Sequence, residues 1–114
     1  MSRPLHRVYS RYTLEALRLF AEMIRFERKK QKMTESELAE RAGISRSMLQ
    51  RIEKADPKCE LGVVFEVAVL LGLPLFDAEA DANQLAAVRR QTEEKLRLMP
   101  QRIRKQNQEV FDDF

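Results

Sequence analysis

Hydrophobic side chains recur at intervals of three and four residues from position 14 to position 24, which predicts an amphipathic helix. Thr13 can serve as its N-cap, because its hydroxyl can accept a hydrogen bond from the first turn. The pattern turns basic between Arg25 and Lys32, where the helix would end. We expect the apolar stripe to cover the core of a small domain; it consists of Leu14, Leu17, Phe20, Ala21 and Ile24.

Two shorter helices are predicted between residues 33 and 54. Thr34 and Glu37 have the spacing of a capping box, in which each side chain bonds to the backbone N–H of the other residue. Gly43 follows the last periodic position and can adopt the left-handed conformation that ends a helix. Ser45 can then cap a second helix. The two helices would pack together through Leu38, Ala39, Ala42, Ile44, Leu49 and Ile52.

The second of these helices has a polar face that points away from the core. Leu49 and Ile52 turn inward at helical spacing, so neighbouring polar and cationic side chains share the opposite side. These residues are Arg46, Ser47, Gln50, Arg51 and Lys54. Two short helices joined by a tight turn, the second with such a face, are typical of a DNA-reading module.

The segment after Pro57, ELGVVFEVAVLLGLPLF, is rich in Val and Phe and at first suggests a strand. Its apolar residues nevertheless recur with helical spacing, so we predict a helix ended by Gly72 and Pro74. The core-facing set would be Leu61, Val64, Phe65, Ala68 and Leu71. A second apolar set exceeds what one buried face needs, and we assign it to the interface of a homodimer: Val63, Val67, Leu70 and Leu73.

A further helix is predicted from about residue 80 to residue 99. Its narrow apolar stripe consists of Leu85, Val88, Thr92, Leu96 and Met99. This stripe could pack across a dimer, bind a partner protein or lean on the core of its own chain. Pro100 ends the helix, and the remaining residues run from a basic cluster to an acidic, aromatic end that is typical of a flexible tail.

These patterns predict an all-α protein with one domain and an appendage, since 114 residues that are 44% hydrophobic can bury one small core. We divide the chain into an N-terminal arm (1–12), a DNA-binding domain (13–77), a C-terminal helix for dimer or partner contact (78–99) and a tail (100–114).

Positive charge is concentrated on the predicted DNA-reading segment. The whole chain has a net charge of +3, whereas residues 25–58 hold 10 Lys and Arg against 6 Asp and Glu, a net charge of +4. Charged runs are usually solvated faces, but beside this motif they indicate contacts to the DNA backbone. The candidate phosphate contacts are Arg25, Lys29, Lys30, Lys32, Thr34 and Lys54.

Several classes of function are disfavoured by the sequence. One cysteine, Cys59, and one histidine, His6, cannot form an ordinary His/Cys metal cluster, and we expect no cofactor. No phosphate-binding loop and no nucleophile with its base is present, so we do not expect an enzyme. With no long apolar run and no signal peptide, a cytoplasmic protein without membrane contact is expected.

Residues 33–54 and the basic helix before them resemble the helix-turn-helix of the Xre/Cro/CI family of transcriptional regulators. The resemblance implies a five-helix, lambda-repressor-like domain whose second motif helix lies in the major groove of double-stranded DNA. It places Arg46, Ser47, Gln50 and Arg51 at or beside base-reading positions. It also implies an ion pair between Arg28 and Glu53 that ties the first helix to the recognition helix.

The sequence departs from the family pattern at two positions. Relatives commonly carry Gln where this chain has Glu35, and a carboxylate would repel the phosphate that Gln contacts. Relatives commonly carry Gly where this chain has Ala55, so we expect the recognition helix to end differently, through Asp56 and Pro57.

A second resemblance covers most of the chain. The segment after Pro57, together with LMPQRIRKQ and the DDF ending, looks like HipB-like antitoxins, regulators that occur beside HipA-type kinase toxins. This resemblance implies a homodimer that represses its own operon from a palindromic operator and also binds the toxin kinase. The alternative is a stand-alone Xre-family regulator without a toxin partner.

Overall fold

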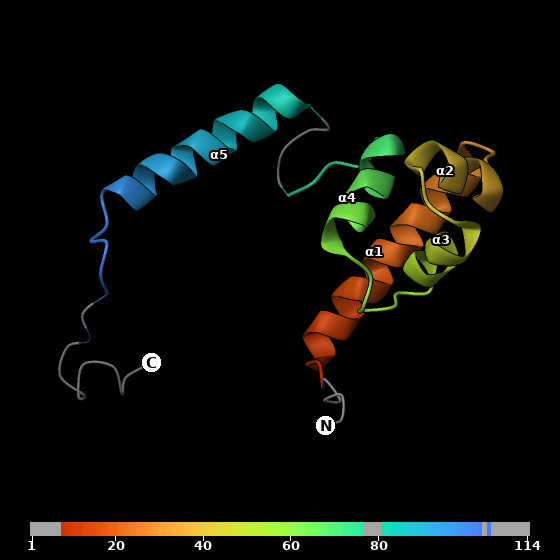
Figure 1. The fold of residues 1–114 in the computed structure, drawn as a ribbon, viewed down its shortest axis with the longest axis horizontal. Coiled ribbons are helices and arrows are strands. Elements are labelled where there is room, and N and C mark those ends of the chain that lie inside the picture. Colours follow the sequence, from red (N-terminus) through yellow and green to blue (C-terminus); the bar gives the residue numbers. More distant parts are fainter. Residues whose placement is uncertain (1–7, 77–80, 104, 106–114) are drawn as a thin grey trace. The chain divides into compact units, whose positions relative to one another are not determined.

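The computed structural model describes residues 8–76, 81–103 and 105, and in these ranges it contains five α-helices and no strand. The helices are α1 (Arg11–Lys30), α2 (Glu35–Ala42), α3 (Arg46–Glu53), α4 (Leu61–Leu70) and α5 (Ala82–Arg97) (Figure 1). The chain divides into two units, and α1 to α4 belong to the first (1–80), whereas α5 belongs to the second (81–114). The predicted all-α fold is confirmed. No helix in the described ranges is both long and apolar enough to cross a membrane.

The first helix begins two residues earlier than its predicted cap. Ser10, not Thr13, is the N-cap, and its hydroxyl oxygen accepts a hydrogen bond from the Thr13 backbone N–H at 3.2 Å. Ser10 and Thr13 both have the spacing of an N-cap. Ser10 is the observed cap because the Leu14 N–H can then bond to the Ser10 carbonyl at 3.1 Å, which adds a helical turn. The helix therefore begins at Arg11, within the segment predicted as the N-terminal arm.

Local sequence signals position α2 and α3. The predicted capping box is present: the Thr34 N–H donates to Glu37 Oε1 at 2.8 Å, and the Glu37 N–H donates to Thr34 Oγ1 at 3.1 Å. Gly43 adopts a left-handed φ of 70° where α2 ends. The Ser45 hydroxyl then caps α3 by accepting from the Met48 N–H. The tight turn between the two helices therefore has both ends fixed by caps.

The core lies between α1, α2, α3 and α4. Its fully buried side chains are Ile24, Leu38, Leu49 and Val67, and Met33, Ala39, Ile52 and Leu71 complete the cluster. Val67 was assigned to the dimer interface, and that assignment is wrong because Val67 has no exposed surface in the single chain. Val63 and Leu73 are half-buried against the same cluster. Leu61, assigned to the core, is 67% exposed.

Val64, Ala68 and Leu71 face the core as predicted, whereas the assignments of Leu61 and Val67 are wrong because nearly every position of α4 is apolar. Its mean hydropathy is high on all sides, so periodicity alone cannot tell the inner face from the outer one. The observed inner face, Val64, Val67, Ala68 and Leu71, still keeps the three-and-four spacing of a helix. Gln31 fixes this arrangement from α1, since its side-chain amide donates to the Leu71 carbonyl at 2.8 Å.

The helix α5 has no buried residue. It is capped by Asp81, whose carboxylate accepts from the Asn83 N–H at 2.9 Å. Of the predicted stripe, Leu85 is half-buried, whereas Val88, Leu96 and Met99 are exposed. Most helical stability in proteins comes from packing of an amphipathic face, and within the second unit no residue of α5 is buried. Most of the predicted tail lies outside the described residues.

Two helices end at residues other than glycine in the left-handed conformation. Lys32 has a φ of 61° after α1, and Ala55 has a φ of 63° after α3. At the second site the Ala55 N–H bonds to the Ile52 carbonyl and the Asp56 N–H to the Arg51 carbonyl, at 3.1 and 3.0 Å. The expectation that α3 would end differently because Ala replaces Gly is therefore wrong.

Substitution of Ala55 by Gly should stabilise the domain by about 1 kcal/mol, because it relieves a left-handed Cβ clash at a smaller cost in chain entropy. The reverse change at the end of α2, Gly43→Ala, should destabilise it by a similar amount, since Gly43 has the same sign of φ. Urea denaturation of the two variants would measure both changes in the free energy of unfolding. Equal shifts of the same sign would contradict this assignment of strain.

Candidate nucleic-acid interface

The exposed face of α3 carries the four residues predicted to read bases. Arg46, Ser47 and Arg51 are exposed, and Gln50 is half-buried at the side that faces α2. Leu49 and Ile52 are buried in the core, and their packing fixes the rotation of α3 about its own axis. The structure thus brings the four side chains together on one short helix with a defined orientation.

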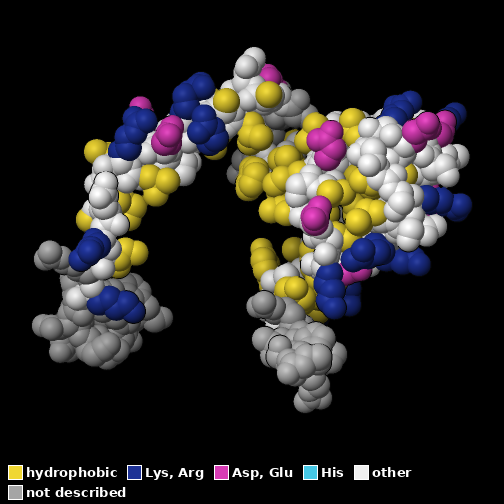
Figure 2. All heavy atoms as spheres, in the orientation of Figure 1, with side chains coloured by type: hydrophobic (Ala, Val, Ile, Leu, Met, Phe, Trp, Pro, Cys, Tyr) yellow, Lys and Arg dark blue, Asp and Glu magenta, His cyan; other side chains and the backbone are white. Residues whose placement is uncertain are grey.

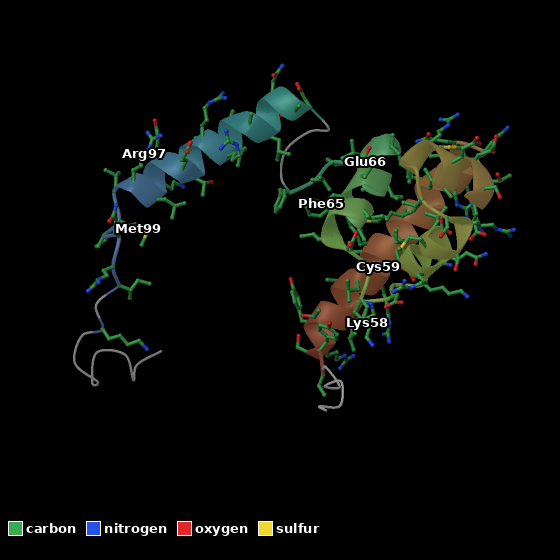
Figure 3. The ribbon with its side chains drawn as sticks, viewed as in Figure 1. Lys58, Cys59, Phe65, Glu66, Arg97 and Met99 are labelled. Carbon is green, nitrogen blue, oxygen red and sulfur yellow. The ribbon has the colours of Figure 1, made fainter. Side chains whose placement is uncertain are left out.

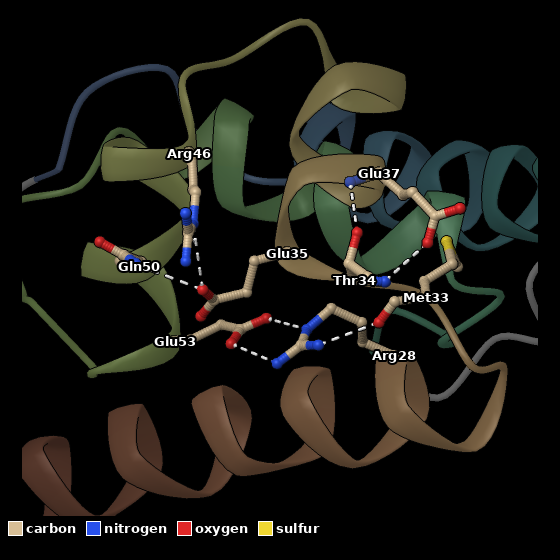
Figure 4. A network of polar contacts seen from close by, with 8 residues as sticks. All are labelled: Arg28, Met33, Thr34, Glu35, Glu37, Arg46, Gln50 and Glu53. Carbon is tan, nitrogen blue, oxygen red and sulfur yellow. Dashed lines mark hydrogen bonds and ion pairs between the residues drawn. The ribbon is translucent and has the colours of Figure 1, made fainter.

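A carboxylate that the sequence did not connect to α3 holds two of these residues. Glu35, the first residue of α2, accepts a hydrogen bond from Gln50 Nε2 at 3.2 Å and lies 3.5 Å from Arg46 Nε (Figure 4). The hydrogen bond from Gln50, followed by the charges of Arg28 and Arg46, lowers the pKa of Glu35 below its usual value. No short-range sequence signal marks this contact, because Glu35 and Gln50 are 15 positions apart.

A second carboxylate, Asp56 in the loop after α3, holds Arg51. Arg51 Nε lies 2.9 Å from Asp56 Oδ2, and the other oxygen of Asp56 accepts from the Lys58 N–H. The Lys58 N–H and then Arg51 lower the pKa of Asp56, whereas the hydrogen bond to Asp56 raises that of Arg51. Arg51 is therefore a charged, oriented side chain, held through Nε.

The ion pair implied for Arg28 and Glu53 is present and buried. Arg28 Nε and Nη2 donate to the two oxygens of Glu53 at 2.7 and 3.0 Å, and Nη1 donates to the Met33 carbonyl at 3.0 Å (Figure 4). The side chains are only 9% and 3% exposed. The hydrogen bond to Glu53 raises the pKa of Arg28 further. One guanidinium thus connects α1, the segment before α2, and α3.

The residues predicted to contact phosphates are exposed, namely Arg25, Lys29, Lys30, Lys32, Thr34 and Lys54. In Figure 2, Lys and Arg side chains of the first unit gather over the side that carries α2 and α3, whereas hydrophobic side chains gather over the side that carries α4. The capping box occupies the Thr34 backbone N–H, so only its hydroxyl proton is available to a phosphate.

An apolar groove of about 540 Å³ lies between the start of α1 and the start of α4. Leu17, Phe20 and Val64 line it, with Cys59 from the preceding loop and Phe65, whose ring packs edge-on against Phe76 at 6.2 Å (Figure 3). Burial raises the pKa of the Cys59 thiol, which makes it a poor nucleophile at neutral pH. The described residues contain no group of His, Cys, Asp and Glu that could hold a metal ion.

Comparison with known families bears on this geometry directly. Residues 24–77 match the family model described as Helix-turn-helix, a segment that runs from the second half of α1 past α4. This segment, a little under half of the chain, is therefore similar to helix-turn-helix domains. No curated protein and no solved structure matches the chain.

Removing one partner of the buried ion pair should strongly reduce the stability of the domain. Replacement of Glu53 by Leu leaves the Arg28 charge buried without its partner and should lower the free energy of unfolding by about 3–5 kcal/mol. The double variant Arg28→Met/Glu53→Leu should recover most of that loss, because neither charge then remains in the core. Thermal or urea denaturation measures both.

The exposed pair of Arg18 and Glu15, 3.3 Å apart on α1, provides the matched control. Glu15→Gln should change stability by less than about 0.5 kcal/mol, because water screens this pair. A loss at Glu15 as large as that at Glu53 would show that the burial of the second pair is not what matters.

Proposed function

We propose that this protein is a sequence-specific DNA-binding repressor that inserts α3 into the major groove of its operator. The observation that carries the proposal is the exposed, capped face of α3, oriented by a buried ion pair, within a segment that matches the helix-turn-helix family. Occupation of an operator that overlaps a promoter would block transcription.

Base reading and backbone binding are assigned to different residues. The terminal nitrogens of Arg46 and Arg51 suit the O6 and N7 acceptors of guanine, whereas the amide of Gln50 suits adenine. The hydroxyl of Ser47 can donate a hydrogen bond to either base or accept one from it. The exposed residues at the end of α1 and around the motif, Arg25, Lys29, Lys30, Lys32, Thr34 and Lys54, would neutralise or bind phosphates and fix the docking register.

We also propose that the repressor is a homodimer on a palindromic operator. A single α3 reads few base pairs, whereas a two-fold dimer reads two half-sites about one helical turn apart. Exposed apolar surface supports a protein contact: on α4, Leu70 is 37% exposed and Leu61 and Val69 are exposed as well. With Val67 in the core, the interface is assigned to Leu70 together with the half-buried Val63 and Leu73.

The more specific role that we propose is that of an autoregulating antitoxin which binds a HipA-type kinase toxin. The uncovered apolar stripe of α5 supports a protein partner beyond DNA. A stand-alone regulator is the alternative and would use the same DNA-binding surface. The neighbouring gene distinguishes the two roles, because an antitoxin requires a kinase-like toxin encoded beside it.

Selection from a randomised duplex library should yield a palindromic site. Arg46→Ala and Arg51→Ala should each reduce discrimination at one or two positions of the half-site by about 1–3 kcal/mol. Lys30→Ala should instead weaken all sequences alike and reduce the slope of log affinity against log salt by about 1. If both arginine variants weaken all sequences equally, the assignment of base readers is wrong.

Light scattering at micromolar concentration should give the mass of a dimer, and Leu70→Glu should give that of a folded monomer with weakened operator affinity, because a charge on the interface opposes association. Leu19→Glu, on the exposed face of α1, provides a control that adds the same charge elsewhere. A monomeric wild type with full operator affinity would rule out the dimer. Dissociation by Leu19→Glu alone would rule out α4 as the interface.

A further inference from the structure

Among the residues that the structure describes, Glu35 is the one carboxylate that contacts two proposed base-reading residues. It lies at the first position of α2, and its side chain is 26% exposed at the border with α3. Gln50 Nε2 and Arg46 Nε approach the same oxygen, Glu35 Oε1, at 3.2 and 3.5 Å (Figure 4). Gln50 and Arg46 are four residues apart, so they lie one above the other along the face of α3.

The chemistry of a carboxylate gives this contact a direction. An ionised carboxylate accepts hydrogen bonds and cannot donate one, so it can hold the Gln50 side chain only by its amide nitrogen. The carbonyl oxygen of Gln50 and its second N–H then remain for a base. Arg46 is engaged through Nε, and within the described part of the chain no hydrogen bond occupies its terminal nitrogens. The contact therefore orients both side chains without using the atoms that read DNA.

The charge that supports this contact is maintained by the surroundings of Glu35. The hydrogen bond from Gln50, the nearby Arg28 and Arg46 together hold the pKa of Glu35 below its usual value. Arg28 cannot move away, because Glu53 and the Met33 carbonyl bind it from both sides. At neutral pH Glu35 is thus an ionised acceptor in a fixed position, although a carboxylate at this place adds nothing favourable to the attraction of phosphates.

We propose that Glu35 is a positioning residue that sets the base preference of this interface without touching a base. It restricts Gln50 to one amide orientation and Arg46 to a narrow set of rotamers, which reduces the side-chain entropy lost when a matching sequence is bound. A base pair that requires the other orientation of Gln50 is disfavoured, because Glu35 would then face the carbonyl oxygen of Gln50. The inference rests on the DNA-binding function proposed above.

The test is a comparison of wild type and Glu35→Gln by selection from a randomised duplex library. Glutamine at this position can donate as well as accept, so it can hold Gln50 in either orientation, and it carries no charge for Arg46. Discrimination in the variant should fall by about threefold or more at those positions that Gln50→Ala and Arg46→Ala also affect, and at no others. Combining Glu35→Gln with Gln50→Ala should add no further loss at the Gln50 position.

Glu40→Gln is the matched control, because it removes the same charge from an exposed position of the same helix. Both variants should gain affinity for all sequences from the lost negative charge, but only Glu35→Gln should lose discrimination. Wild-type preferences retained by Glu35→Gln would overturn the inference and leave Glu35 a purely electrostatic role. A wild type that selects no sequence would overturn the DNA-binding function itself.

A measurement without DNA tests the contact independently. In the free protein, the side-chain amide resonances of Gln50 should shift as Glu35 is protonated, with a midpoint below the usual pKa of a glutamate. The same resonances in Glu35→Gln should not titrate over that range. Gln50 resonances that do not respond to pH in the wild type would show that the two side chains are not joined in solution and would overturn the inference.

Discussion

The arrangement of the helix-turn-helix unit depends on the buried guanidinium of Arg28. It donates to both oxygens of Glu53 in α3 and to the Met33 carbonyl just before α2, so one side chain of α1 determines where both motif helices lie. Hydrophobic contacts are tolerant of small rotations, whereas two parallel hydrogen bonds to a carboxylate are not. Such a pair adds orientation more than stability, which is what a helix that must fit a groove requires.

Further polar contacts hold side chains on the exposed face of α3, whose position the Arg28 interactions fix. Glu35 contacts Gln50 and Arg46, and Asp56 contacts Arg51. Each arginine is held through its Nε atom. In the described part of the chain no hydrogen bond occupies the terminal nitrogens of the two arginines, while a nearby carboxylate partly balances the charge of each. In Figure 2 hydrophobic side chains gather over the side of this unit that carries α4, apart from the basic side that carries α2 and α3.

Elements defined by local rules could be predicted from the sequence, and those that depend on distant neighbours could not. The capping box of Thr34 and Glu37 and the turn at Gly43 require only residues a few positions apart, and both are present. The inner face of α4 depends on packing that periodicity does not encode. The cap of α1 is a local feature, but Ser10 and Thr13 both have suitable spacing, and the sequence alone does not choose between them. The contact of Glu35 with Gln50 joins residues 15 positions apart, and only folding of the turn creates it.

The uncovered surface of α5 has a consequence for how this helix exchanges its amide protons. With no buried residue, its hydrogen bonds are held by little more than helix propensity and the Asp81 cap, so the free energy of local opening is small. Within the second unit by itself, its amides are therefore expected to exchange with solvent far sooner than those of α3, whose ends and face are fixed. A surface that covers the stripe slows that exchange, so the exchange rate of α5 reports whether the stripe is covered.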